Sequence, residues 1–285
     1  MTTHIVIMAG GVGSRLYPLS TPEHPKQFID LLECGKTLIQ LTYERFLKTD
    51  PDALFWVVTS AKYVHFIKEQ LPSIPDERIL AEPEARNTAP CIAYACWKIK
   101  KRYPDANMVV TPSDAYIPDA EAFSATMRKA LDFTAGNPAT VCVGISPTSP
   151  HTGYGYINAD ASGADAITKV KAFKEKPDVQ TAERYLAAGS YYWNAGIFVW
   201  NAGTMERELR EHAPQIAEIM DNLYPSLYTE GEDDALATLF PRCPKISIDY
   251  AVMEKSSSIY MIPASWFWSD LGSFEALGRV TGKKY

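Results

Sequence analysis

The chain has 285 residues, of which 46% are hydrophobic and 22% are charged, and its formal net charge at pH 7 is −6. This composition is that of a globular chain long enough to bury a deep core, and it excludes a low-complexity or collagen-like protein. The acidic balance also argues against a nucleic-acid partner, because binding to a phosphate backbone needs a basic surface, so we expect a small-molecule partner.

The distribution of apolar residues and cysteines indicates the cellular compartment of the protein. No apolar run approaches 18 residues, and the first residues contain neither a basic segment nor a small-residue cleavage site, so we expect no membrane segment and a cytoplasmic location. The five cysteines form no CxxC pair and the five histidines lack zinc-site spacing, which favours reduced thiols and no transition-metal site. Cys91 and Cys96 share one face of a predicted helix, where we expect core packing.

Through the first half of the chain, apolar runs of strand length alternate with segments of helical period. The strand-like runs are residues 4–9, 54–60, 78–83, 107–112 and 140–146. The helix-like segments are residues 37–49, 61–71, 88–103 and 119–136. This alternation predicts a Rossmann-like α/β fold with a mostly parallel central sheet flanked by helices. Because ligands bind at the carboxyl ends of such strands, we expect the loops after the first, third and fourth strands to meet at one edge of the sheet.

After about residue 150 the pattern changes. Residues 151–157, 167–177 and 193–200 have a period of two, around one helical segment at 179–189, which predicts a mixed sheet continuing from the parallel core. Residues 201–256 are predicted to be helical, with Ser247 capping SIDYAVMEK, and a last strand lies within 258–274. No linker divides the chain, so we expect one domain over 1–285. Four tryptophans are expected in its core: Trp193, Trp200, Trp266 and Trp268.

A glycine-rich loop, MAGGVGSRLYPLS, follows the first strand. A Rossmann fingerprint laid on Gly11 and Gly13 would need a glycine where the chain has Leu16, and no Walker loop is present. The N–H groups of small residues can approach a phosphate chain closely, and Arg15 offers a rigid fork of donors. Lys26, in the sequence PKQF, adds an ammonium to the same loop system. The loop therefore indicates an anion site, with a plain turn as the alternative.

Several separated motifs, in order, resemble those of the sugar-1-phosphate nucleotidyltransferases. GGxGxRLxPLS followed by PKQF is similar to the family signature, and EPxxRNTAP at 82–90 resembles its guanylyl branch, the mannose-1-phosphate guanylyltransferases. The resemblance continues through TPSDAYI, FKEKP, WNAGIFVW, DYAVMEK and WSDLGSF. It implies a nucleotide-diphospho-sugar transferase fold with a nucleotide-binding half at about 1–145 and a sugar-phosphate-binding half at about 146–275. The implied substrates are GTP and mannose 1-phosphate, which would give GDP-mannose and pyrophosphate.

The same resemblance assigns the groups that act on the phosphates. Arg15 would contact the departing pyrophosphate, and Lys26 would contact the α-phosphate, where charge develops during in-line attack by the sugar phosphate. Asp114 and Asp270, each after a strand-like run, would hold Mg²⁺, which prefers oxygen ligands; the alternative for either is a helix cap. The nucleotide-binding residues implied by the family are Ala9, Gly10, Gly11, Gly13, Arg15, Lys26, Glu82, Arg86, Asn87, Thr88 and Ser113.

Individual roles follow for the base and the sugar. Glu82 can accept hydrogen bonds from guanine, whereas Asn87 or Thr88 can also simply cap the helix that follows. The residues implied for the sugar phosphate are Gly155, Glu175, Lys176, Asn194 and Gly196. Glu175 can accept from two sugar hydroxyls and Lys176 can hold the phosphate, although the two can also form a surface charge pair. Asp249 fits a substrate contact and a helix first turn equally well.

Other functions explain less of the chain. A dinucleotide oxidoreductase needs the missing glycine, and a metal-dependent glycosyltransferase needs a DxD pair, whereas Asp114 is followed by Ala115 and Tyr116. A noncatalytic, regulatory nucleotide-sugar-binding relative should lack some phosphate or metal residues, yet all are present. A guanylyltransferase for another sugar 1-phosphate stays open. The family pattern commonly continues further, so we expect a short or truncated C-terminal extension, and the resemblance also allows a homodimer.

Overall fold

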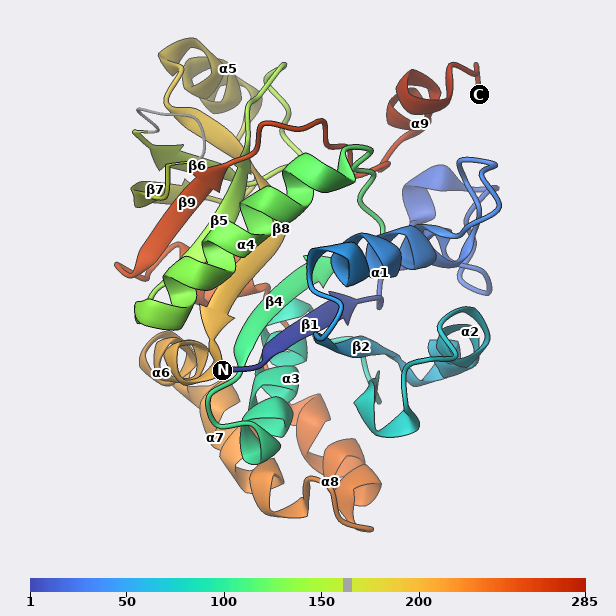
Figure 1. The fold of residues 1–285 in the computed structure, drawn as a ribbon, viewed down its shortest axis with the longest axis vertical. Helices are drawn as coiled ribbons and strands as arrows, with labels where there is room; N and C mark the ends of the chain where they lie inside the picture. The colour runs from blue at the N-terminus through green and yellow to red at the C-terminus, as the bar shows by residue number, and fades with distance from the viewer. Residues whose placement is uncertain (161–165) are drawn as a thin grey trace.

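A computed structural model describes residues 1–160 and 166–285. Its strands are β1 (Thr3–Met8), β2 (Leu54–Ser60), β3 (Ile79–Glu82), β4 (Asn107–Pro112), β5 (Thr140–Ile145), β6 (Tyr156–Ala159), β7 (Thr168–Lys174), β8 (Tyr191–Asn201) and β9 (Ile259–Pro263). Within the described residues these strands form a single sheet in the order β3-β2-β1-β4-β8-β5-β9-β7-β6, which runs through both halves of the chain (Figure 1).

The helices are α1 (Leu38–Thr49), α2 (Val64–Gln70), α3 (Thr88–Arg102), α4 (Ala120–Gly136), α5 (Val179–Ala188), α6 (Ala202–His212), α7 (Pro214–Leu223), α8 (Glu232–Leu239) and α9 (Phe274–Thr281). Helices α1 to α5 agree with the expected segments to within a few residues, whereas α9 was not expected. Side-chain caps fix several starts: Asp119 accepts from the N–H of Ala122, and Ser273 accepts from that of Ala276. The helical stretch expected over 201–256 is divided into α6, α7, α8 and a π-helical turn, Asp249–Met253.

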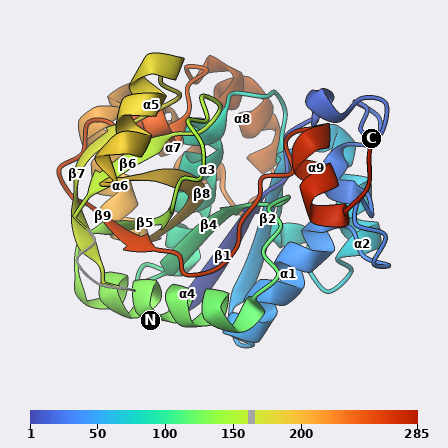
Figure 2. The same cartoon turned by 90° about the horizontal axis from the view of Figure 1, so that it is seen from above.

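The helices cover the sheet in two layers. Helices α1 and α4 lie on one face, and α3, α6, α7 and α8 lie on the other (Figure 2). Strand β1 contributes side chains to the core on both faces of the sheet, because successive side chains of a strand point to opposite faces. Val6 packs with α3, whereas Ile5 and Ile7 pack with α1 and α4. The four expected core tryptophans are buried, and so are Cys91 and Cys96. None of the helices in 1–160 and 166–285 is long and apolar enough to cross a membrane.

The sheet is more mixed than the sequence pattern predicts. Strands β1 to β4 are parallel neighbours, as expected, but β8 lies antiparallel between β4 and β5. The run at 140–146, expected to extend the parallel core, forms β5, which among the described strands pairs in parallel with β9 and antiparallel with β8. An apolar run of this kind predicts a buried strand, but nothing local in it selects the neighbouring strand. The sheet is therefore mixed parallel and antiparallel, and the fold is mixed α/β.

Strand direction brings the expected loops together at one edge. Strands β1, β3 and β4 all end there, and Ser113 donates its N–H to the carbonyl of Met8 at 3.2 Å. Since β8 runs the opposite way, its first half, with Asn194 and Gly196, reaches the same edge. A third apolar cluster seals the region by joining Leu16 of the glycine loop to Leu271 and to Leu277 of α9.

Candidate active site

The glycine loop after β1 is held in place by a buried glutamine. The Gln27 amide donates to the carbonyl of Ala9 at 3.1 Å and to that of Gly11 at 2.8 Å. Ala9 also accepts from the Thr59 hydroxyl at 2.9 Å, so both of its backbone groups are bonded within the protein. At Gly13, φ is +62°, and a Cβ would lie 2.9 Å from the Lys26 side chain, which explains why glycine is required there.

A cavity of about 410 Å³ opens between this loop and the start of β8. Nine of the expected residues line it: Gly10, Gly11, Glu82, Asn87, Thr88, Ser113, Asp114, Asn194 and Gly196. Asp249, which the sequence left open, lines it too, together with residues that were not expected in the site: Met8, Gln27, Ala85, Cys91, Pro112, Phe198 and Ile248. The lining therefore combines apolar side chains, which suit an organic ring, with amide, hydroxyl and carboxyl groups that can fix its orientation.

Glu82 ends β3 inside this cavity. Its Oε1 is buried without a hydrogen-bond partner among the described residues, and burial raises the pKa of the carboxyl to about 8. A buried, unpaired acceptor is costly unless a ligand supplies a donor. Glu82 therefore presents an unsatisfied acceptor that an N–H group of a bound molecule could satisfy.

The start of α3 forms the next part of the wall. Asn87 has φ of +69°, an uncommon conformation for a residue other than glycine, and its side chain accepts from the N–H of Thr88. The Thr88 hydroxyl accepts from the N–H of Ile248 at 2.8 Å, which ties this helix to the segment before Asp249. Arg86 pairs with Glu84 at 2.9 Å, and neither side chain lines the cavity, although Ala85 between them does. Asn87 thus caps the helix in this structure, and both Asn87 and Thr88 line the cavity.

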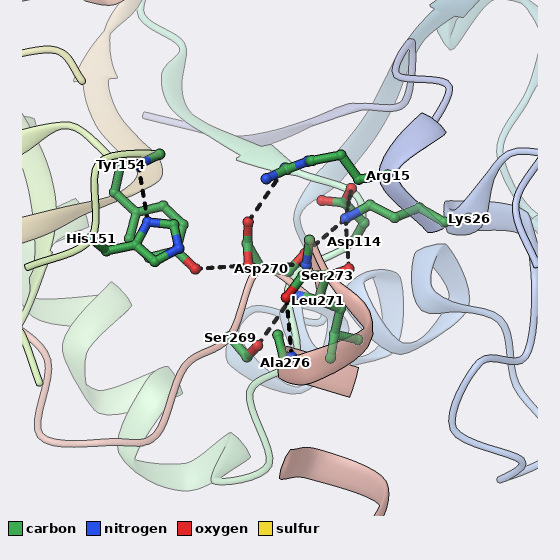
Figure 3. A network of polar contacts seen from close by, with 12 residues as sticks. Arg15, Lys26, Asp114, His151, Tyr154, Ser269, Asp270, Leu271, Ser273 and Ala276 are labelled. Atoms are coloured by element: carbon green, nitrogen blue, oxygen red, sulfur yellow. Dashed lines mark hydrogen bonds and ion pairs between the residues drawn. The ribbon is translucent and has the colours of Figure 1, made fainter. Parts of the chain in front are cut away.

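The charged residues expected at the phosphates converge beside the cavity. The Lys26 ammonium lies 3.0 Å from Asp114 Oδ2 and donates to the carbonyls of Asp270 at 2.7 Å and Leu271 at 3.3 Å. The Arg15 guanidinium lies 3.7 Å from Asp270 Oδ2 and is largely exposed. Figure 3 shows Arg15, Lys26, Asp114 and Asp270 pointing toward one another from separate segments. Two cations and two acids that are far apart in the sequence are therefore brought together by the fold.

This arrangement suits a divalent cation shared with a ligand. The ammonium of Lys26 is already surrounded by three oxygens, of which one belongs to the Asp114 carboxylate and two are backbone carbonyls. No group of three or more His, Cys, Asp or Glu side chains suited to a metal occurs in the part of the chain that the structure describes. Mg²⁺ commonly takes one or two protein carboxylates and completes its shell with water and substrate phosphates. Asp114 and Asp270 fit that requirement.

The residues expected at the sugar phosphate form a connected group next to the cavity. Asn194 donates its N–H to the carbonyl of Gly155 at 2.8 Å and its side-chain amide to Asp249 Oδ1 at 3.0 Å, and it accepts from the N–H of Gly196 at 3.0 Å. Glu175 lies so close to Gly155 that a Cβ there would be 2.6 Å from Glu175 Oε2. Lys176 bonds to Glu175 and has φ of +43°.

Asp249 belongs to this group. It lines the cavity beside Asn194, and burial together with the charge of Glu175 raises the pKa of its carboxyl to about 7. Tyr154 was missed: its hydroxyl donates to Asp270 Oδ1 at 2.8 Å, and burial, reinforced by the Asp270 charge, raises its pKa, so the phenol stays protonated. The position of Tyr154 beside Gly155 was its only sequence signal.

A mixed sheet with a glycine-rich loop and a cavity at one edge is typical of nucleotide-binding α/β proteins. A family model described as nucleotidyl transferase matches residues 4–284, and the chain belongs to that family. It is 38% identical to the alginate biosynthesis protein AlgA of Pseudomonas aeruginosa, over 98% of this chain and 58% of that protein. It is 36% identical to the mannose-1-phosphate guanylyltransferase of Escherichia coli K12, over 97% of this chain and 59% of that protein.

Solved structures agree with the family. A crystal structure from Thermus thermophilus, named mannose-1-phosphate geranyltransferase, matches with a TM-score of 0.88 and 31% identity, over 100% of this chain and 80% of that one. The chain spans only 58% to 60% of the length of the curated relatives it matches first.

Proposed function

We propose that the protein transfers a guanylyl group from GTP to mannose 1-phosphate, giving GDP-mannose and pyrophosphate. The observation that carries this proposal is the cavity that extends from Glu82 to Asn194 and Asp249, with Lys26 and Asp114 paired beside it. Its lining offers an acceptor for a base in Glu82 and acceptors for hydroxyls in Asn194 and Asp249. The names of relatives matched over nearly the whole chain support the choice of substrates.

The chemistry asks for charge neutralisation rather than proton transfer. The sugar phosphate is an ionised nucleophile, so its oxygen can attack the α-phosphorus in line without a general base. Lys26 would stabilise the charge that develops on the α-phosphate, and Arg15, which is largely exposed, would hold the pyrophosphate as it departs. The backbone around Gly10, Gly11 and Gly13 gives the phosphates room to approach.

Asp114 and Asp270 would hold Mg²⁺ in this reaction. The cation supplies neutralisation of the phosphate charge and a template for their alignment. For this to happen, Lys26 must exchange Asp114 for phosphate, since the two are bonded at 3.0 Å without ligands. Glu175, Lys176 and Asn194 would orient the sugar phosphate for attack, with Gly155 and Gly196 leaving space for it.

Guanine recognition is assigned to Glu82. The N1 and N2 groups of guanine are donors, and the unpaired Glu82 Oε1 is an acceptor with no partner of its own among the described residues. Adenine lacks donors at these positions, so ATP would leave Glu82 unsatisfied. Asn87, Thr88 and Ser113 would complete the nucleotide contacts from the cavity lining, and Arg86 would add a contact from beside it.

One coupled assay tests the proposal. Pyrophosphate release is measured for GTP, ATP and dTTP, each with mannose 1-phosphate and glucose 1-phosphate, with and without Mg²⁺. We expect release to be fastest with GTP and mannose 1-phosphate and to require Mg²⁺. Absence of pyrophosphate release with every pair would overturn the proposed reaction, and equal rates for all three nucleotides would overturn the role of Glu82. A rate for Asp270→Asn that matched the wild type across a Mg²⁺ titration would remove Asp270 from the metal site.

A further inference from the structure

Tyr154 connects an aromatic cluster to the Asp270 carboxylate. Its ring stacks on His151 with centroids 3.8 Å apart and an interplanar angle of 12°, and it meets the edges of Trp193 and Trp268 at 5.2 Å each. Figure 3 shows the Tyr154 hydroxyl directed at Asp270, on the side away from Lys26. Because the ring is held by three aromatic neighbours, the position of its hydroxyl is fixed by the fold.

The two oxygens of Asp270 have different surroundings. Oδ1 accepts from the Tyr154 hydroxyl at 2.8 Å and from the N–H of Gly272 at 3.0 Å. Oδ2 faces Arg15 at 3.7 Å, which is too long for a hydrogen bond. Oδ1 is therefore hydrogen-bonded within the protein, whereas Oδ2 faces the charged side chains of the site. Tilting the carboxylate out of its present orientation would break both bonds at one oxygen, so these bonds fix the direction in which the other oxygen points.

The turn that contains Asp270 is supported by a contact from outside it. Leu271 has φ of +44°, and the turn is supported by Lys26, which donates to the carbonyls of Asp270 and Leu271. Lys26 is also expected to bind phosphate, so this support weakens when it turns to substrate. The bond from Tyr154 to Asp270 comes from a different segment and does not involve Lys26.

We propose that Tyr154 is a positioning residue for phosphoryl transfer, which orients the Asp270 carboxylate so that Oδ2 meets the divalent cation bound with the nucleotide. The inference rests on the proposed function, because it concerns the same site. It also gives the sugar side a direct connection to the metal, since Tyr154 precedes Gly155, and Gly155 accepts from the N–H of Asn194. Residues that orient metal ligands typically change metal affinity or activity about 10- to 100-fold when removed.

The test compares Tyr154→Phe with Tyr156→Phe. The first variant removes only the hydroxyl on Asp270, and the second removes a neighbouring hydroxyl that donates to the His151 carbonyl at 2.9 Å. Mn²⁺ is titrated into protein saturated with GTP, without sugar phosphate, and binding is followed by water proton relaxation. We expect Mn²⁺ to bind Tyr154→Phe at least about tenfold more weakly than the wild type, with Tyr156→Phe within about twofold.

Kinetics give a second measurement. In Tyr154→Phe the Mg²⁺ concentration for half-maximal pyrophosphate release should rise in parallel, kcat at low Mg²⁺ should fall, and KM for GTP at saturating Mg²⁺ should stay within about twofold. Excess Mg²⁺ should restore most of the rate, which a packing defect would not allow. If Tyr154→Phe does not fold, His151→Ala keeps the hydroxyl but loosens its ring, and a smaller shift of Mn²⁺ affinity in the same direction is expected.

The outcomes separate the two proposals. Wild-type protein that releases pyrophosphate, together with unchanged Mn²⁺ affinity in Tyr154→Phe, would overturn the role of Tyr154 and leave the proposed function standing. A wild type that binds Mn²⁺ but releases no pyrophosphate with any substrate pair would overturn the proposed function, and the Mn²⁺ comparison would still decide whether Tyr154 orients Asp270. Equal losses in Tyr154→Phe and Tyr156→Phe would also contradict the inference.

Discussion

Lys26 Nζ lies 3.0 Å from Asp114 Oδ2, so the cation expected at the α-phosphate is paired with an acid expected at the metal. The pair is shielded, because the Lys26 side chain is only 10% exposed. A divalent cation at Asp114 would compete with the ammonium, and a phosphate would compete with the carboxylate. Each ligand therefore favours the other, and binding of metal and nucleotide should be positively coupled.

Lys26→Met keeps the aliphatic stem but removes the ammonium. We expect pyrophosphate release to fall at least about a hundredfold, because a preorganised charge at the reacting phosphate is lost. The free energy of unfolding should also fall by about 1 to 3 kcal/mol, since Lys26 supports the carbonyls of Asp270 and Leu271. Lys36→Met, which removes an exposed ammonium paired with Glu44, is the control for both measurements. Near-normal turnover in Lys26→Met would remove this residue from the mechanism.

Glu82 should make stability fall as pH rises. The folded protein holds a proton on this carboxyl up to about pH 8, whereas the unfolded chain releases it near 4.5, so the free energy of unfolding decreases between these values. The slope from this one group is at most about 1.4 kcal/mol per pH unit. Glu82→Gln removes that slope, and at pH 8 it should be more stable than the wild type in urea. Glu69→Gln, at an exposed site, should follow the wild type; parallel profiles for wild type and Glu82→Gln would contradict the shifted pKa.

The same carboxyl predicts a pH dependence of nucleotide binding. The ionised form is the better acceptor for guanine donors, so the Kd for GTP should decrease as pH rises from 6 to 8 and level off above the pKa. Glu82→Gln should bind GTP more weakly at pH 8 and show little change with pH. Calorimetric titration at four pH values measures this, and a wild-type Kd that is constant from pH 6 to 8 would contradict it.

Asp249 should affect the sugar phosphate and not the nucleotide. Asp249→Ala removes the acceptor for the Asn194 amide, and we expect KM for mannose 1-phosphate to rise at least about fivefold, the equivalent of about 1 kcal/mol, with KM for GTP within about twofold. Asp249→Asn keeps an acceptor for Asn194 and should be milder. Because the pKa of Asp249 is about 7, the wild-type KM for mannose 1-phosphate should change with pH near that value. The KM of Asp249→Asn for the same substrate should not change there. Equal changes in both KM values would show that Asp249 supports the whole cavity instead.

Gln27 should control the shape of the glycine loop. Gln27→Leu has a similar volume but cannot donate to the carbonyls of Ala9 and Gly11, so we expect the free energy of unfolding to fall by about 1 to 3 kcal/mol and the Kd for GTP to rise. Gln180→Leu, at an exposed position on α5, is the control. Stability and GTP affinity that both match the control would mean that the loop holds its shape without Gln27.

The local sequence pattern predicted which residues lie at the candidate site. It predicted less well which of these residues contact one another. The ends of β1, β3 and β4 could be placed at one edge, because parallel strands share a direction, and Gly10, Glu82 and Ser113 follow from that. The contact of Lys26 with Asp114 and that of Tyr154 with Asp270 join distant segments, and no local pattern specifies such pairs. Cys91 was correctly expected to be buried, but the pattern of an apolar helix face could not tell that part of this face borders a cavity.

The position of β8 has a consequence for the exchange of parts between related proteins. This strand carries Asn194 and Gly196 near one end of the cavity and Phe198 on its wall, while pairing with β4 on one side and β5 on the other. A chimera that joined residues 1–145 of this chain to the second half of a relative would import β8 along with the sugar contacts, and part of the nucleotide wall would come from the donor. Such a recombinant would keep Glu82, the residue assigned to the base, while Phe198 on the cavity wall would come from the donor, so nucleotide preference would depend on residues from both parents.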